Sequence, residues 1–163
     1  AAERGWLALG EAAGLPVQLF RLAGIYGPGR NVIEQLRAGT AKRLRRPGQI
    51  FSRIHVEDIA TVLEASMAKP RPGGIYNLCD DDPAAPGDVV AHAAELIGIE
   101  PPPEQSPDDA ALSPMARSFW DDNKRVRNDR IKSELGVRLG YPSYREGLAA
   151  ILRAEADATR SGR

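Results

Sequence analysis

The stretch from Val17 to Asn31 constrains the fold most, because its character changes twice within a short distance. Val17 to Leu22 is an apolar run with one arginine, which is typical of a buried strand. A cluster of turn formers follows, at Gly24, Gly27, Pro28 and Gly29. Neither a helix nor a strand is expected to continue through this cluster. In open α/β sheets, the loop that leaves the carboxyl end of a strand is where ligands bind, so the stretch predicts a ligand-binding loop.

Hydrophobic spacing predicts alternating helices and strands in the rest of the chain. Helical patterns cover residues 1–13, 32–38, 56–68, 86–97 and 128–135, with Asn31 and Asn128 as predicted N-caps. A capping box from Ser143 to Glu146 opens a last helix, which is expected to fray from residue 159. Strands are predicted at 17–22, 49–54 and 75–78, whereas residues 104–118 show no clear period. The expected buried face of helix 56–68 consists of Val56, Ile59, Ala60, Leu63 and Met67.

Composition limits the class of protein. The chain has 163 residues, enough for one domain with a core, and 22 basic residues balance 22 acidic ones. This balance gives no reason to expect a nucleic-acid or membrane partner. Cys79 is the single cysteine, so no intramolecular disulfide can form, and a reducing compartment is favoured. Without a long apolar run or a signal pattern, we expect a cytoplasmic protein.

The amino terminus begins inside a helical pattern. Ala2, Trp6, Leu9 and Ala13 share one helix face, and no methionine precedes them. We therefore expect the chain to be the carboxyl-terminal part of a longer protein.

Four segments in order resemble one enzyme family. Arg21 to Gly29 is similar to an R-x-x-x-[IV]-[YW]-G-P-G segment, and Arg53 to Ala60 is similar to an [IV]-H-V-x-D-[IV]-A element. Gly74 to Leu78 and Asn123 to Gly136 resemble two later segments of the same family. On these motifs, the chain resembles the extended short-chain dehydrogenase/reductases, the NAD-dependent epimerase/dehydratase group.

The resemblance implies an α/β fold, in which part of a doubly wound, Rossmann-type parallel sheet carries a small α/β substrate-binding domain. Residues 1–30 would end the dinucleotide-binding domain, and residues 31–163 would be mainly the substrate-binding domain, with 56–79 returning to the Rossmann sheet. The implied cofactor is NAD or NADP. The implied partners are a small-molecule substrate, the missing amino-terminal half of the same protein and a second copy of the chain in a homodimer.

The resemblance also indicates site residues. Leu22, Ala23 and Ile25 would contact the nicotinamide end of the cofactor, and Gly24 would face the substrate. The alternative for Gly24 is that it only permits a tight turn. Arg30 and Asn31, which end the glycine loop, are further candidate substrate-binding residues.

Arg53 and His55 are the best candidates for polar contacts with the substrate. Two residues apart on a strand, they would share a face, and the arginine fork suits a phosphate or a carboxylate. The alternative for His55 is a residue at the start of a helix that hydrogen-bonds to backbone. Asp58 is expected to cap or pack structurally.

No catalytic residue is predicted in this chain. The family chemistry needs a Tyr-x-x-x-Lys pair on a helix, and no such pair is present. Tyr26 and Arg30 have the right spacing, but Pro28 and two glycines between them preclude a helix. The glycine-rich dinucleotide loop is also missing. The chain alone is therefore expected to be inactive.

Three other features have both a functional and a structural interpretation. The basic run from Lys42 to Arg46 is either an anion site or a solvated face. Asp80 to Asp82 forms a turn more readily than a metal site, because consecutive residues do not converge on one ion. Phe119 and Trp120 form either an aromatic wall over the substrate or part of the core.

The predicted function is part of an NAD(P)-dependent oxidoreductase or epimerase/dehydratase acting on a small carbonyl, hydroxyl or sugar-derived substrate. The main alternative is a dinucleotide-binding sensor or regulator of the same fold, without turnover. A free-standing anion-binding domain is a third possibility, which an exposed sheet edge and apolar face would disfavour.

Overall fold

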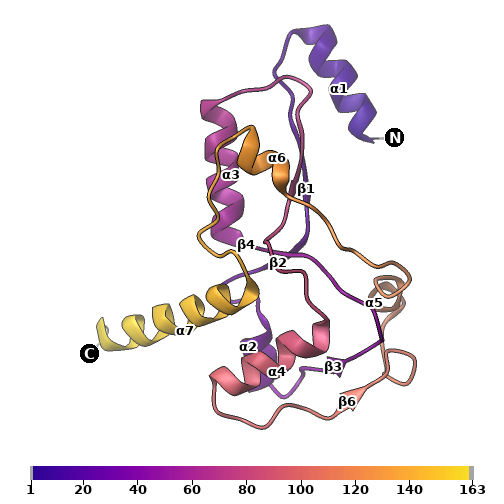
Figure 1. The fold of residues 1–163 in the computed structure, drawn as a ribbon, viewed down its shortest axis with the longest axis vertical. Coiled ribbons are helices and arrows are strands. Elements are labelled where there is room, and N and C mark those ends of the chain that lie inside the picture. The colour runs from indigo at the N-terminus through magenta and orange to yellow at the C-terminus, as the bar shows by residue number, and fades with distance from the viewer. Residues whose placement is uncertain (1, 162–163) are drawn as a thin grey trace.

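The computed structural model describes residues 2–161 and has an α/β architecture (Figure 1). The strands are β1 (Leu19–Leu22), β2 (Gly24–Tyr26), β3 (Arg43–Leu44), β4 (Arg53–His55), β5 (Ile75–Leu78) and β6 (Glu104–Gln105). The helices are α1 (Ala2–Ala13), α2 (Val32–Arg37), α3 (Val56–Ala68), α4 (Pro86–Leu96), α5 (Pro114–Ser118), α6 (Asp129–Ser133) and α7 (Tyr144–Ser161). Among these helices, none is both long and apolar enough to cross a membrane.

All strand pairs in the described part are parallel. β1 pairs with β5, β2 with β4, and β3 with β6. The register places Leu22 beside Leu78 and Gly24 beside Arg53, so the carboxyl ends of β1 and β5 lie next to the first residues of β2 and β4. The predicted strand 75–78 is confirmed, whereas the predicted strands 17–22 and 49–54 are shorter in the structure.

The prediction that no strand continues beyond Leu22 is wrong. The chain bends only at Ala23, and Gly24–Tyr26 forms β2, which leaves β1 and pairs with a different strand. Extended backbone is open to glycine as to any residue, and the turn begins only at Gly27. β1 is also less buried than predicted, since Leu22 is 48% exposed.

Most predicted helices are confirmed with small changes in length. Helix α1 covers the predicted helix from residue 2 to residue 13, and position 1 lies outside the described residues. α2 and α4 end before Gly39 and Gly98, whose positive φ angles of 67° and 70° stop each helix. α7 opens with the predicted capping box, in which the Ser143 hydroxyl accepts from the Arg145 amide. Helix α7 is regular up to Ser161, so the predicted fraying is absent there, and 162–163 lie outside the described residues.

The predicted buried face of helix α3 is wrong. Val56, Leu63 and Met67 are exposed, Met67 by 74%, whereas Asp58, Val62 and Ser66 are buried. The helix turns the side with Asp58 and Val62 inward, because Asp58 accepts hydrogen bonds from backbone amides of the segment before α7. Of the predicted face, Ile59 is half-buried and packs against the core. An apolar stripe therefore stays uncovered in the described part of the chain.

Two further expectations need correction. Asn128 does not cap α6 with its side chain, because its amide nitrogen instead donates to the Cys79 carbonyl and the Asp81 carboxylate. The segment without clear period, 104–118, contains β6 and α5, both too short to produce a pattern.

Two main hydrophobic clusters hold the structure together. One packs α3 and α6 against β4 and β5, around Val62, Tyr76 and Ile131. The other packs α2, α4 and α7 together, around Ile33, Ala93 and Leu148. Figure 1 shows these groups at opposite ends, with β2 and β4 between them. The region where the two groups meet is therefore the place where a cavity can form.

Candidate functional site

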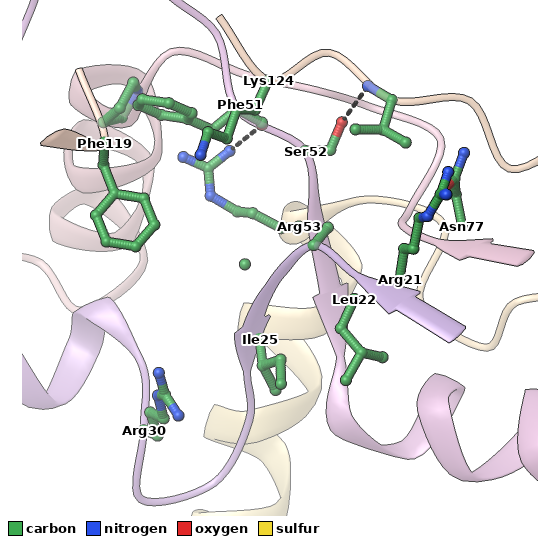
Figure 2. A pocket seen from close by; sticks show the side chains of 14 residues that line it. Arg21, Leu22, Ile25, Arg30, Phe51, Ser52, Arg53, Asn77, Phe119 and Lys124 are labelled. Atoms are coloured by element: carbon green, nitrogen blue, oxygen red, sulfur yellow. Dashed lines mark hydrogen bonds between the residues drawn. The ribbon is translucent and has the colours of Figure 1, made fainter. Parts of the chain in front are cut away.

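A cavity of about 700 Å³ lies at the carboxyl end of β1 and beside β2 and β4. Its far wall comes from the segment 119–126, which is distant in sequence. The lining residues are Arg21, Leu22, Ala23, Gly24, Ile25, Arg30, Phe51, Ser52, Arg53, Asn77, Pro86, Phe119, Lys124 and Val126. Figure 2 shows Ile25, Arg30, Arg53 and Phe119 around one open space. We name this cavity the cationic pocket.

The cationic pocket brings together most of the predicted site residues. The three predicted cofactor contacts line it, as do the substrate candidates Gly24, Arg30 and Arg53. Asn31 and His55 do not belong to its lining.

Asn31 has a structural position. It is buried, and its side-chain oxygen accepts hydrogen bonds from the amides of Ile33 and Glu34 at 2.9 and 3.1 Å. Its amide nitrogen donates to the Gly27 carbonyl at 3.0 Å. The side chain thus caps α2 and closes the glycine turn, with no group directed at the pocket.

His55 occupies the start of α3 and is 1% exposed. Its Nδ1 accepts from the Glu57 amide at 3.3 Å, and its ring packs 3.9 Å from that of Tyr141, between centroids. Burial lowers the pKa of His55, which favours the neutral ring that this acceptor role requires. This geometry matches the structural alternative for His55.

Arg53 directs a fixed positive charge to the pocket. Its Nη1 donates to the carbonyls of Phe51 and Ala84 at 2.9 and 3.1 Å (Figure 2). Burial lowers the pKa of Arg53, but a guanidinium starts from so high a value that it stays charged at neutral pH. Two carbonyls hold one end of the guanidinium in place, and its other donors remain open.

The charged side chains that line the pocket all have the same sign. Four cationic side chains line it, and no aspartate or glutamate does. Arg21 is neutralised by Glu3 at 2.6 Å. Within the described residues, Arg30 and Lys124 form no ion pair, and the Lys124 Nζ lies 5.1 Å from the Phe119 ring centroid. A site with cations and apolar walls favours an anion on an apolar body.

Gly24 is not needed for a turn. It lies in β2, its φ is not positive, and a Cβ added there would meet Ser52 O at 3.5 Å and Arg53 Cγ at 3.8 Å. These are ordinary contact distances, so the backbone would accept a side chain. The tight-turn alternative is therefore not supported, and the missing side chain leaves space in the pocket.

Sequence analysis missed Lys124 and Val126, which lie beyond the unpatterned segment. The adjacent Phe119–Trp120 pair was the available signal, and the two rings have different positions. Trp120 is buried against Phe51, at 5.5 Å between ring centroids, whereas Phe119 is 52% exposed and lines the pocket. Trp120 therefore belongs to the core, whereas a role of Phe119 in covering a substrate stays a prediction.

Tyr26 is unsuited to acid–base chemistry. It is 8% exposed, its hydroxyl donates to the Ser143 carbonyl at 3.3 Å, and burial raises the pKa of its phenol. It lies on β2 and Arg30 in the following turn, so the two form no helical pair, as predicted.

The other two charged features have structural partners. In the basic run, Arg45 pairs with Asp88 at 2.5 Å and Arg46 pairs with Asp108 at 2.8 Å. The aspartates form a turn in which Asp81 pairs with Lys132 and Asp82 with Arg145. No group of residues in the described range is arranged to hold a metal ion.

No protein-family model matches the sequence. Protein YeeZ of Escherichia coli K12 is 29% identical over 129 residues, which cover 79% of this chain and 42% of YeeZ. A 3-diazoavenalumate denitrifying reductase from Streptomyces sp is 29% identical over 155 residues, covering 87% of this chain and 48% of the reductase. The chain spans about half the length of the curated relatives it matches.

Solved structures show the same fold. A functionally unknown conserved protein from Silicibacter pomeroyi is 59% identical, with a TM-score of 0.88 over 94% of this chain and 53% of that protein. The dTDP-glucose 4,6-dehydratase of Bacillus anthracis, solved with NAD, is 20% identical, with a TM-score of 0.70 over 93% of this chain and 48% of the enzyme. The human epimerase family protein SDR39U1, solved with NADPH, is 18% identical, with a TM-score of 0.71 over 88% of this chain and 52% of that protein.

These comparisons confirm the predicted fold class. The neighbours are Rossmann-type NAD(P)-binding proteins, with epimerases, dehydratases and a reductase among the relatives. Several neighbours were solved with NAD or NADPH bound. The chain therefore has the architecture of about half of such a protein.

Proposed function

We propose that this chain forms the substrate side of an NAD(P)-dependent oxidoreductase or epimerase/dehydratase, with an amino-terminal half supplying the dinucleotide loop and the acid–base pair. The observation that carries the proposal is the cationic pocket, where the backbone from Leu22 to Ile25 leaves the carboxyl end of β1, a strand that pairs in parallel with β5. Ligands bind at this edge in open α/β sheets. Leu22, Ala23 and Ile25 would contact NAD or NADP, and Gly24, Arg30 and Arg53 the substrate.

The pocket also suggests the class of substrate. Arg30, Arg53 and Lys124 would bind a carboxylate or phosphate, and Phe51 and Phe119 would cover the apolar part of the molecule. We therefore propose a small carbonyl or hydroxyl compound that bears one anionic group.

The test is NAD(P)H binding and turnover by the intact protein. NADH fluorescence titration is expected to show binding when the amino-terminal half is present and none with this chain alone. Oxidation of NADH in the presence of small carbonyl acids would support an enzyme. Binding without turnover of any carbonyl or hydroxyl acid would instead favour the sensor, and absence of binding would contradict both.

Arg30→Met is expected to weaken binding of an anionic ligand by about 10-fold, because one charge-assisted hydrogen bond is lost. Stability should change by less than about 0.5 kcal/mol, since the Arg30 side chain is exposed. Calorimetric titration with benzoate measures the affinity. Arg127→Met is the control, because Arg127 is exposed and pairs with Asp129 outside the pocket. Equal affinity in wild type and Arg30→Met would contradict the role of Arg30.

Gly24→Asn is expected to reduce ligand affinity by about 10-fold or more while the fold is retained. The new side chain would fill part of the pocket, and its Cβ would not clash with neighbouring atoms. Gly24→Ala should have a smaller effect in the same direction. The free energy of unfolding should stay equal or rise by about 0.5 kcal/mol, since glycine is unfavourable inside a strand. A loss of stability in Gly24→Ala would show that the backbone, rather than the ligand, requires glycine.

A further inference from the structure

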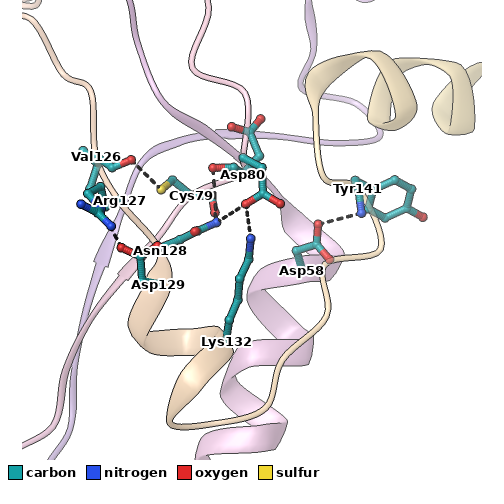
Figure 3. Close-up of polar contacts among 10 residues, drawn as sticks. Asp58, Cys79, Asp80, Val126, Arg127, Asn128, Asp129, Lys132 and Tyr141 are labelled. Carbon is teal, nitrogen blue, oxygen red and sulfur yellow. Dashed lines mark hydrogen bonds and ion pairs between the residues drawn. The ribbon is translucent and has the colours of Figure 1, made fainter.

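Asp80 differs from the two aspartates that follow it. Asp81 and Asp82 have cationic partners at 2.5 Å, whereas Asp80 is 2% exposed and no cationic side chain in the described residues pairs with its carboxylate. Only the backbone of Arg53 and Asp82 lies close enough to favour its ionisation by hydrogen bonding. Figure 3 shows Asp80 next to Cys79, just beyond the end of β5. A buried carboxyl group without a cationic partner is costly, so its position calls for an explanation.

The backbone of Asp80 places it beside the pocket. Its amide donates to the Arg53 carbonyl at 2.7 Å, so Asp80 directly adjoins the strand that carries Arg53. Arg53 is the charged group with the strongest effect on the Asp80 carboxyl, and it favours ionisation. The backbone of Asp82, in the same turn, also favours ionisation, whereas the Asp82 carboxylate opposes it.

Other titratable groups face this pair from the packed elements. Tyr26 from β2 and Tyr144 from α7 both lie close enough to influence Arg53, and Asp58 from α3 influences Tyr26. Both phenols have a pKa raised by burial, so they remain neutral near neutral pH. The two phenols therefore add no charge beside Arg53 and Asp80.

We propose that Asp80 is a positioning residue of the cationic pocket, whose charge sets how strongly Arg53 attracts an anionic ligand. This inference rests on the proposed function, because it takes the pocket to bind an anion. An ionised Asp80 offsets the positive field of Arg53 inside a low-dielectric site, and a protonated Asp80 leaves that field intact.

The pair gives ligand binding a dependence on pH. Burial raises the pKa of Asp80 to about 7, although the Arg53 guanidinium acts in the opposite direction. Below that pH, Asp80 is neutral and the anion meets the full charge of Arg53. Above it, Asp80 is ionised and opposes the anion. Affinity is therefore expected to fall by about 5- to 10-fold as the pH rises from about 6 to about 8.

The test measures benzoate binding to the intact protein by calorimetry across this range. Benzoate keeps one negative charge throughout, and its ring suits the apolar walls. Asp80→Asn keeps the shape of the side chain without its charge, so its affinity should match the low-pH wild type at every pH. Asp81→Asn is the matched control, because the neighbouring Asp81 carboxylate pairs with Lys132 instead of facing Arg53, and it should keep the pH dependence.

The outcomes separate this inference from the proposed function. A wild-type affinity that falls with pH, together with a flat profile in Asp80→Asn, supports the inference. A flat wild-type profile overturns it without affecting the anion pocket. A slope that persists in Asp80→Asn also overturns it, because a group other than Asp80 then titrates. Absence of benzoate binding at every pH overturns the proposed anion pocket, and the role of Asp80 with it.

Discussion

Asp58→Ala is expected to lower the free energy of unfolding by about 3 to 5 kcal/mol. The carboxylate is 1% exposed and accepts from the amides of Gly140 and Tyr141 at 2.6 and 3.1 Å (Figure 3). Alanine would leave both amide donors, whose hydrogen bonds to Asp58 are partly buried, without that acceptor, and each such donor costs about 1 to 3 kcal/mol. The loss would also release the segment that leads from α6 into α7.

Denaturant unfolding followed by circular dichroism measures this effect. Asp58→Asn should have an intermediate cost of about 2 kcal/mol, since an amide keeps one acceptor oxygen but turns an NH₂ group toward a donor. Asp157→Ala is the control, because the side chain of Asp157 is 69% exposed and pairs with Arg160 on the surface of α7. It should change stability by less than about 0.5 kcal/mol. A similar small change for Asp58→Ala would show that the two amides find other partners.

The position of Asp58 also explains why hydrophobic periodicity failed for α3. The apolar stripe of this helix was identified correctly, but the side turned inward is the one that carries Asp58 and Ser66. Two hydrogen bonds to the amides before α7 fix this orientation, and no local pattern encodes them. Where a buried polar contact sets the rotation of a helix, periodicity gives the extent of the helix without its direction.

The strands illustrate a related limit. The turn formers around Gly27 were read from sequence, yet β2 was missed because its three residues include a glycine. Its partner β4 is also short, and only their parallel pairing stabilises both. Strand β5 was predicted correctly because it is apolar and bounded by turn residues on both sides. Local sequence signals therefore identify a strand whose own residues are apolar enough to be buried. They miss a short strand that is stabilised only by pairing with a strand distant in sequence.

The part of the pocket that comes from one continuous stretch of sequence was predictable, and the part that comes from a distant segment was not. The wall from Leu22 to Ile25 comes from one continuous stretch, and motif resemblance identified it. The opposite wall, with Lys124 and Val126, comes from a segment without period, so its approach to β4 depends on contacts such as Ser52 Oγ accepting from the Val126 amide at 2.9 Å. The separation of Asn31 and His55 from the pocket also required the structure, because capping and ligand binding use the same residue types.

Gly147→Ala is expected to lower the free energy of unfolding by about 2 to 3 kcal/mol, although alanine is the better helix former. A Cβ at this position would lie 2.1 Å from the Tyr26 Oη and 2.7 Å from two of its ring carbons. The ring cannot retreat easily, since Tyr26 is fixed on β2 and packs edge-on against His55, at 5.2 Å between centroids. Helix α7 would therefore have to move away from β2, which loosens the core next to the cationic pocket.

Two comparisons isolate the close contact as the cause. Gly5→Ala in α1 introduces a Cβ with nothing within 4 Å, so it should raise the free energy of unfolding by about 0.5 to 1 kcal/mol. This change is opposite in sign to the one expected for Gly147→Ala. Tyr26→Phe removes the hydroxyl that lies closest to the new methyl group. In that background, Gly147→Ala should cost less than in the wild type, because part of the overlap is already relieved. Equal costs in both backgrounds would mean that α7 is destabilised by something other than its contact with the Tyr26 hydroxyl.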